Sequence, residues 1–157
     1  VQGILSENSW SLDTRFLPAD EVRRRVEQAT GREIWHTLQQ VEPIGPRGLL
    51  DLVIVAPATG NTLGKLANGI IDTPVAMAVK SHLRNNRPVL LAVSTNDGLS
   101  GCAQNIGRLL NVKNVYFVPF GQDAPVKKPA SLVAHFDRLA EAAECALRGE
   151  QIQPLLV

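Results

Sequence analysis

Three runs of apolar residues along the chain lack the alternation of apolar and polar positions that marks a half-exposed strand. They are DLVIVAP at residues 51–57, PVLLAVS at 88–94 and NVYFVPF at 114–120. Such runs are typical of parallel strands whose two faces are both covered by helices. The short stretch VQGILS at residues 1–6 predicts a further strand, and the polar residues that follow, up to residue 16, predict a loop.

Helical spacing of apolar residues fills most of the segments between these strands. The predicted helices cover residues 18–30, 61–70, 74–85, 102–111 and 132–147. The segment VEPIGPRGLL at residues 41–50 contains two prolines and two glycines, so it predicts an irregular connection. Strand and helix alternate as in β-α-β units. The sequence therefore predicts an α/β fold of the Rossmann-like, doubly wound kind, with a mainly parallel sheet as the middle of three α-β-α layers.

The composition predicts one domain over residues 1–157 and excludes several classes of partner. A formal net charge of +1 gives no reason to expect nucleic acid or an anionic membrane, and the three arginines at 23–25 predict a solvated helix face. No apolar run approaches the roughly 20 residues that cross a bilayer, so no membrane segment is expected. The chain begins with Val1 and not with Met, as in a processed product or a piece of a longer protein.

Two cysteines, Cys102 and Cys145, suit neither a disulfide scaffold nor a metal site, and no secretory signal is recognisable. The two free cysteines and the missing signal favour a location in the cytoplasm. Cys102 stands at a predicted helix start, where it has either a thiol pKa lowered by the helix dipole or the role of a small buried residue.

The apolar tail at residues 152–157 either contacts another protomer or lies across its own domain.

Small polar residues follow each of the three apolar strands: ATGNT at residues 58–62, STNDG at 94–98 and GQDAP at 121–125. Because ligands of doubly wound sheets bind outside the carboxyl ends of the strands, we expect these loops to converge on one ligand site. Local turn and cap chemistry explains one such loop on its own. Three such loops in succession favour a ligand site over purely local turn chemistry.

The first loop is not the phosphate loop of a nucleoside-triphosphate site. That loop needs four residues between its first glycine and the Gly-Lys pair, and then a Ser or Thr that reaches magnesium. Here Gly60 and Gly64 enclose three residues, and Leu66 takes the hydroxyl position. What remains is a strand end, a turn and a helix start, which favour a polar or anionic ligand.

The segment APATGNTLGKLANGIID at residues 56–72 resembles the signature of the homo-oligomeric flavin-containing Cys decarboxylase superfamily. Its phosphopantothenoylcysteine decarboxylases read Pro-Ala-(Ser/Thr)-Ala-Asn-Thr, followed by Lys, Ala, Gly-Ile and Asp at similar spacing. A second element of the superfamily, Pro-Ala-Met-Asn, falls on residues 93–96, where only Asn96 is shared. The resemblance implies a flavoprotein-type sheet that binds FMN.

Two departures separate this chain from the decarboxylases. Pro43 stands where they have an essential His, and Ser100 stands where they have a Trp. Instead, the strings VEPIGPRG, STND, VPFGQDAP and QIQPLLV resemble the dipicolinate synthase B-subunit family, over nearly the whole chain. Members of that family begin with a strand, a glycine-rich loop and a helix that have no counterpart in these 157 residues. In FMN-binding relatives that loop cradles the flavin phosphate.

This second resemblance implies a role in sporulation, in the cytoplasm of the mother cell. The implied reaction makes dipicolinate, pyridine-2,6-dicarboxylate, from dihydrodipicolinate or its hydrated precursor. The implied partner is the A subunit of dipicolinate synthase, which is nicotinamide-dependent and carries NAD(P), and the resemblance also implies a homo-oligomer. An FMN-dependent decarboxylase of the phosphopantothenoylcysteine type and a non-catalytic binding or assembly protein stay open as alternatives.

The predicted site for FMN or a dicarboxylate combines the first two loops. Asn61 and Asn96 are predicted to orient the ligand in the reaction. Asp97 is a candidate catalytic base, although capping of the following turn agrees equally well with its position. The candidate cofactor-binding residues are Pro57, Ala58, Thr59, Asn61, Thr62, Ser94, Thr95 and Asn96.

Other polar residues allow more than one interpretation. Asp123 has the same two interpretations as Asp97, and Lys65 either offsets a ligand carboxylate or is solvated. Asp72 is predicted to cap the helix that follows it. No metal site is predicted, because the histidines lie outside the three loops: His36 on an edge segment, His82 in a helix and His135 in the last helix.

Overall fold

The computed structural model describes all residues from Val1 to Val157. Its centre is a five-stranded mixed sheet built around β2 (Val89–Thr95). β1 (Val53–Ala58) pairs with β2 in parallel on one side, and β3 (Val115–Phe117) pairs in parallel with the beginning of β2 on the other. β5 (Leu132–Ala134) pairs antiparallel with the end of β2, and β4 (Phe120–Gly121) pairs antiparallel with β5.

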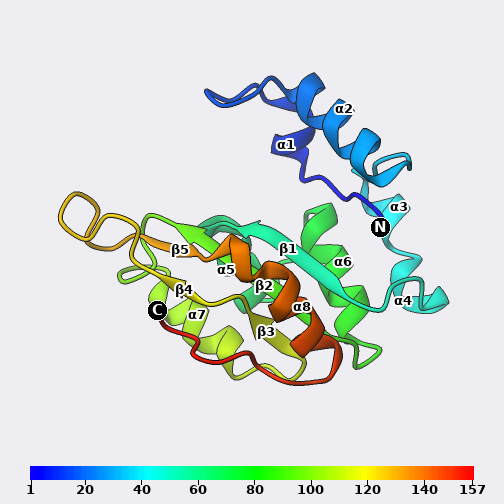
Figure 1. Cartoon of the computed structure of the whole chain (residues 1–157). Helices are drawn as coiled ribbons and strands as arrows, with labels where there is room; N and C mark the ends of the chain where they lie inside the picture. The colour runs from blue at the N-terminus through cyan, green and yellow to red at the C-terminus, as the bar shows by residue number, and fades with distance from the viewer.

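Helices cover both faces of this sheet (Figure 1). α5 (Gly60–Ala67) contacts both α6 (Pro74–Leu83) and α7 (Ala103–Leu110), and α6 packs on β1 and β2. α8 (Leu139–Leu147) contacts β2 from the opposite face and lies in front of the strands in Figure 1. The predicted three-layer, Rossmann-like arrangement is confirmed. None of the helices has the length and apolar character that crossing a membrane requires.

β2 forms the middle of the hydrophobic core. Its residues from 89 to 93 are all at most 1% exposed, and since neighbouring side chains of a strand point to opposite faces, both faces of β2 are covered. This explains why its sequence lacks alternation. β1 is less enclosed: Val53 and Val55 are buried, whereas Ile54 is 42% exposed. β1 pairs only with β2, so its other edge is open.

The C-terminal tail covers the opposite side of the sheet, next to β3 and β4. The Gln151 side chain accepts a hydrogen bond from the Phe117 N–H and donates one to the Phe117 carbonyl, both at 2.8 Å. Farther along, the Phe120 N–H donates to the Leu155 carbonyl at 3.0 Å. A side chain at Gly121 would overlap the Val157 carbonyl. Of the two interpretations of the tail, the structure supports packing on its own sheet.

The last predicted helix was wrong in its first half. Residues 132–134 form β5, and a short 3-10 helix, η1 (Phe136–Arg138), precedes α8. Leu132 and Ala134 are buried while Val133 is not, which is the alternation of a strand. The backbone groups of this segment pair with β2 and β4, so tertiary pairing overrides the local helical pattern.

The N-terminal third also differs from the prediction. Residues 1–6 make only one bridge, between Ile4 and Trp35, and do not form an extended strand. The predicted loop contains α1 (Glu7–Ser11), and the predicted connection at 41–50 contains α4 (Ile44–Arg47), preceded by α3 (Leu38–Val41). α2 (Ala19–Thr30) confirms the helix predicted before Gly31.

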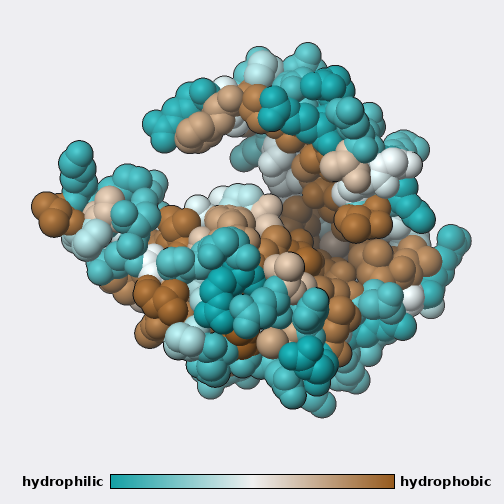
Figure 2. Space-filling view, in the orientation of Figure 1, coloured by the Kyte–Doolittle hydropathy of each residue, from teal (hydrophilic) through white to brown (hydrophobic).

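α1 and α2 stand apart from the sheet, and Figure 2 shows a hollow between them and the sheet with apolar side chains on its walls. Part of this hollow is a groove of about 150 Å³ between residues 4–6 and β1. Ile4 and Leu5 line one side, and Val53, Ile54 and Val55 line the other. The open edge of β1 therefore faces this apolar groove.

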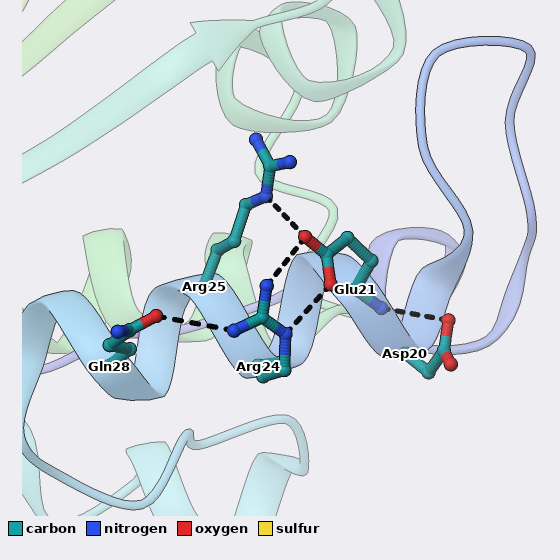
Figure 3. A network of polar contacts seen from close by, with 5 residues as sticks. All are labelled: Asp20, Glu21, Arg24, Arg25 and Gln28. Atoms are coloured by element: carbon teal, nitrogen blue, oxygen red, sulfur yellow. Dashed lines mark hydrogen bonds and ion pairs between the residues drawn. The ribbon is translucent and has the colours of Figure 1, made fainter.

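Glu21 joins two of the three consecutive arginines of α2 in one network (Figure 3). Its carboxylate accepts two hydrogen bonds from Arg24 at 2.8 Å and one from Arg25 at 2.6 Å. These bonds lower the pKa of Glu21 from 4.5 to about 2. Arg24 and Arg25 are more than half exposed, so the predicted solvated helix face is confirmed for these two. It is wrong for Arg23, which is partly buried, lies over the Trp10 ring and donates to the Trp10 carbonyl.

A ¹³C NMR titration of Glu21 is expected to give a midpoint near pH 2. The pKa is lowered on folding, so the network stabilises α2 above pH 4.5, and this contribution is lost as the pH falls toward 2. Replacing both Arg24 and Arg25 with glutamine is expected to return the midpoint toward 4.5. An unchanged midpoint in that variant would show that the arginines are not the cause.

Candidate functional site

The first two polar loops begin side by side, where β1 and β2 end. Ala58, the last residue of β1, pairs with Val93 of β2. Ser94 and Thr95 continue β2 by two residues and pair with β5. β1 and β5 therefore flank the end of β2, and the expected convergence of the two loops is observed.

The first loop leads directly into α5. Thr59 is the N-cap of α5, and its hydroxyl oxygen lies 3.3 Å from that of Thr62. Ala58 is fully buried and supports the loop, whereas Pro57 and Asn61 are exposed. The first N–H groups of a helix have no partner inside the helix and carry its positive dipole end, so they favour polar or anionic ligands.

The second loop is a tight turn held by Asp97. The Thr95 hydroxyl donates to Asp97 Oδ1 at 2.5 Å. The main-chain carbonyl of Asp97 accepts from the N–H groups of Ser100 and Cys102, both at 3.0 Å. The hydrogen bonds of the two loops thus involve threonines and Asp97, and they leave the exposed amides of Asn61 and Asn96 free for a ligand.

Gly60 brings the two loops into direct contact, which the sequence did not reveal. A Cβ atom at this position would lie 2.7 Å from Thr95 Oγ1 and 3.0 Å from Asp97 Oδ1. The first distance is shorter than Cβ contacts in real proteins, so a side chain at this position would have to displace Thr95. The only signal in the sequence was a glycine at the start of a predicted helix, where Ser, Thr, Asp or Asn would also have been expected.

Cys102 lies beneath the second loop and is 2% exposed. Burial raises the pKa of its thiol, and the negative charge of nearby Asp97 raises it further. Of its two interpretations, the small buried residue is confirmed, and the lowered thiol pKa is wrong because burial and then the charge of Asp97 raise it.

The third loop joins β4 to β5 and packs against the second. The N–H of Leu99 donates to the carbonyl of Ala130 at 2.9 Å. Within the loop, Asp123 pairs with Lys128 at 3.2 Å. The hydroxyl of Ser131 and then Lys128 lower the pKa of Asp123 below its usual 3.8. Both partners of Asp123 belong to its own loop, which favours the structural interpretation of this residue.

Lys65 and Asp72 bind each other. Lys65 Nζ lies 2.6 Å from both carboxylate oxygens of Asp72, and this contact lowers the pKa of Asp72. The prediction that Asp72 caps α6 was wrong, because the cap is Thr73, whose hydroxyl accepts from the Ala76 N–H. Lys65 is therefore engaged within the chain and is neither simply solvated nor free for a ligand carboxylate.

Replacing Lys65 with methionine is expected to leave the affinity for a ligand of the first two loops within about twofold, because Asp72 already holds the Lys65 ammonium. The pKa of Asp72 should rise toward 3.8 in the same variant. Calorimetry measures the first quantity, and an NMR titration measures the second. A loss of affinity of more than about tenfold would place Lys65 on the ligand instead.

The three histidines lie away from the first two loops. His36 stacks on Trp10 with ring centroids 3.6 Å apart, which places it in the N-terminal part. His82 is buried in α6, where burial and then the charge of Arg87 lower its pKa. His135 is exposed and precedes η1, so its predicted place in the last helix was wrong. No group of three His, Cys, Asp or Glu residues is arranged to hold a metal ion.

Comparison with known proteins places the chain among the flavoproteins. The family model described as Flavoprotein matches residues 1–138. The chain belongs to the Flavoprotein family. It is 46% identical, over all of its 157 residues, to the B subunit of dipicolinate synthase from Bacillus subtilis (strain 168), and covers 78% of that protein. The resemblance based on VPFGQDAP and the related strings is therefore confirmed.

Solved structures agree with this family membership. The crystal structure of the dipicolinate synthase B subunit from Bacillus halodurans matches with a TM-score of 0.90 at 44% identity, over 98% of this chain and 79% of that one. The FMN-dependent cysteine decarboxylase SpaF matches with a TM-score of 0.60 at 18% identity, over 80% of this chain and 71% of that one. The likeness to SpaF shows a shared flavoprotein fold and nothing further.

Proposed function

We propose that the chain is the flavoprotein-type B subunit of a two-component complex that makes dipicolinate during sporulation. The observation that carries this proposal is the 46% identity, over the whole chain, to the dipicolinate synthase B subunit of B. subtilis. The fold supports it, because the TM-score of 0.90 to the B. halodurans relative extends over 98% of this chain. The substrate is dihydrodipicolinate or its hydrated precursor.

The edge formed by the first two loops fits the ring end of FMN. The amides of Asn61 and Asn96 both donate and accept hydrogen bonds, which suits the alternating C=O and N–H groups of the flavin pyrimidine. The hydroxyls of Thr59 and Ser94 lie on the same two loops. The loops offer no free cation for the phosphate end, since Lys65 is held by Asp72. A bound flavin would supply two-electron redox chemistry at this edge.

The same donors fit a small dicarboxylate. Asn61 and Asn96 donate to carboxylate oxygens, and the first backbone N–H groups of α5 add donors at its positive end. In this role the chain holds the substrate and keeps its ring in one orientation while a proton and a hydride leave. The hydride acceptor is NAD(P) on the partner, the A subunit of dipicolinate synthase.

Exposed apolar side chains near this edge provide contacts for other protein chains. Leu99, in the turn after β2, is 55% exposed, and Val126, in the third loop, is 94% exposed. Both lie beside the polar loops and not on the far side of the sheet. We propose that contacts here serve assembly with the A subunit and with further copies of this chain.

A second candidate function is a binding or assembly protein without catalysis of its own. The observation in its favour is that the one carboxylate of the second loop, Asp97, already accepts a hydrogen bond from Thr95. An FMN-dependent decarboxylase is not supported: Pro43 caps α4 where those enzymes have His, and Ser100 replaces their Trp.

Reconstitution with the A subunit tests the proposed function. The two purified proteins are mixed with NAD(P)⁺ and freshly made dihydrodipicolinate, and dipicolinate is followed by its ultraviolet absorbance. Product is expected only when both proteins are present. An equal rate with the A subunit alone would contradict the proposal, and binding to the A subunit without any effect on the rate would favour the assembly function.

A further inference from the structure

Gly60 of the first loop contacts Thr95 and Asp97 of the second, and we call this contact the loop seam. A Cβ at Gly60 would meet Thr95 Oγ1 at 2.7 Å and Asp97 Oδ1 at 3.0 Å. Gly60 does not have a positive φ, so its backbone conformation is open to any residue. The space at the seam, and not the backbone, excludes a side chain here.

Thr95 and Asp97, the residues of the second loop at the seam, are held by hydrogen bonds. Thr95 is β-branched and sits in β2, which restricts its χ1 angle, and its hydroxyl is bound to Asp97. Asp97 is fixed through its main-chain carbonyl, which accepts from the N–H of buried Cys102. A hydroxyl held in this way makes room for an added methyl group only by giving up its hydrogen bond to Asp97.

The seam sits between the two asparagines. Asn61 follows Gly60 on the first loop, and Asn96 lies between Thr95 and Asp97 on the second. A contact at Gly60 therefore constrains the backbone positions from which the two amides extend.

We propose that Gly60, Thr95 and Asp97 are positioning residues that fix the spacing of Asn61 and Asn96, an inference that rests on the proposed function of these asparagines. Asp97 then acts through the hydrogen bond from Thr95 and not as a base. It needs an acceptor oxygen for this role, but not a negative charge.

Matched variants separate these roles. Gly60→Ala adds one methyl group at the seam, whereas Gly64→Ala adds one in the same helix, where the nearest heavy atom of another residue is Asn105 Nδ2 at 3.6 Å. Asp97→Asn keeps the acceptor oxygen and removes the charge, and Asp97→Ala removes both. Thr95→Ser keeps the hydroxyl, and Thr95→Ala removes it. Thermal melts identify any variant that fails to fold.

The test measures kcat and KM for dipicolinate formation in the reconstituted complex, with dipicolinate affinity by calorimetry. Gly60→Ala and Asp97→Ala are expected to raise KM and weaken binding about tenfold or more, because small displacements of positioned groups have large effects. Gly64→Ala should stay near the wild type, whereas Asp97→Asn and Thr95→Ser should each recover most of what Asp97→Ala and Thr95→Ala lose. In a Thr95→Ala background, Gly60→Ala should add no further loss, as expected of coupled residues.

Each contrary result has its own meaning. If Asp97→Asn abolishes kcat or removes a limb of the pH profile, Asp97 is a base and the inference is overturned. Wild-type behaviour of a folded Gly60→Ala variant, or fully additive losses with Thr95→Ala, also overturns it. A wild-type complex that makes no dipicolinate and binds none contradicts the proposed function itself, whatever the variants do.

Discussion

Replacing Phe117 with alanine is expected to lower the free energy of unfolding by about 3–5 kcal/mol, as for other large aromatic residues truncated in a core. The Phe117 ring is fully buried and packs against Phe120 with ring centroids 6.0 Å apart. Its backbone N–H and C=O are both bound by the Gln151 side chain, which restricts how far β3 can move to fill the cavity. Chemical denaturation followed by circular dichroism measures the loss.

Val112 provides the control for this prediction. It is also apolar and close to β3 in sequence, but 41% exposed, so Val112→Ala should cost well under half as much. A loss of less than about 1 kcal/mol for Phe117→Ala would mean that the tail and β3 collapse freely around the cavity. That result would contradict a tightly held edge at β3.

The double variant Asn61→Ala, Asn96→Ala is expected to lower dipicolinate affinity and the rate of the reconstituted complex by about 10- to 100-fold. Hydrogen bonds to charged groups contribute about 1.5–3 kcal/mol each, and the factor follows from losing one such bond or more. Both side chains are exposed and free of hydrogen bonds in their loops, so their removal should hardly change stability. Calorimetry, steady-state kinetics and a thermal melt measure the three quantities.

Asn8→Ala is the matched control for this variant, since Asn8 is an exposed asparagine on α1, outside the two loops. It should keep wild-type affinity and rate. If the double variant at Asn61 and Asn96 also keeps both, these residues do not orient the ligand, and the site must be sought elsewhere. Lost affinity together with a lowered melting temperature would instead indicate a structural role.

The parallel part of the sheet could be predicted because its information is local. The continuous apolar run of β2 reports burial on both faces, and Gly31 ends α2 as its position predicts. The equally continuous run of β1 does not, because Ile54 on its other face is exposed. The edges of the sheet could not be predicted in this way. β5 carries a helical pattern in its sequence, and only its pairing with Ser94 and Thr95 makes it a strand.

In the candidate site, too, one part could be predicted from the sequence and another could not. The order of strands and loops was enough to place Asn61 and Asn96 on neighbouring loops, because parallel strands bring their carboxyl ends together. Contacts between particular side chains could not be predicted from the sequence. The ion pair of Lys65 with Asp72 and the contact of Gly60 with Thr95 depend on distances that only the folded chain defines.

The central claim is that the edge with Asn61 and Asn96 is a ligand site serving dipicolinate formation, and the visible absorbance spectrum of the purified full-length protein tests most directly whether that ligand is a flavin. The protein is mixed with FMN, and unbound ligand is removed by gel filtration. We expect about one flavin per chain to be retained, and we expect the Asn61→Ala, Asn96→Ala variant to lose it while Asn8→Ala does not. A colourless protein that rejects FMN would contradict the flavin site and leave the redox chemistry to the A subunit.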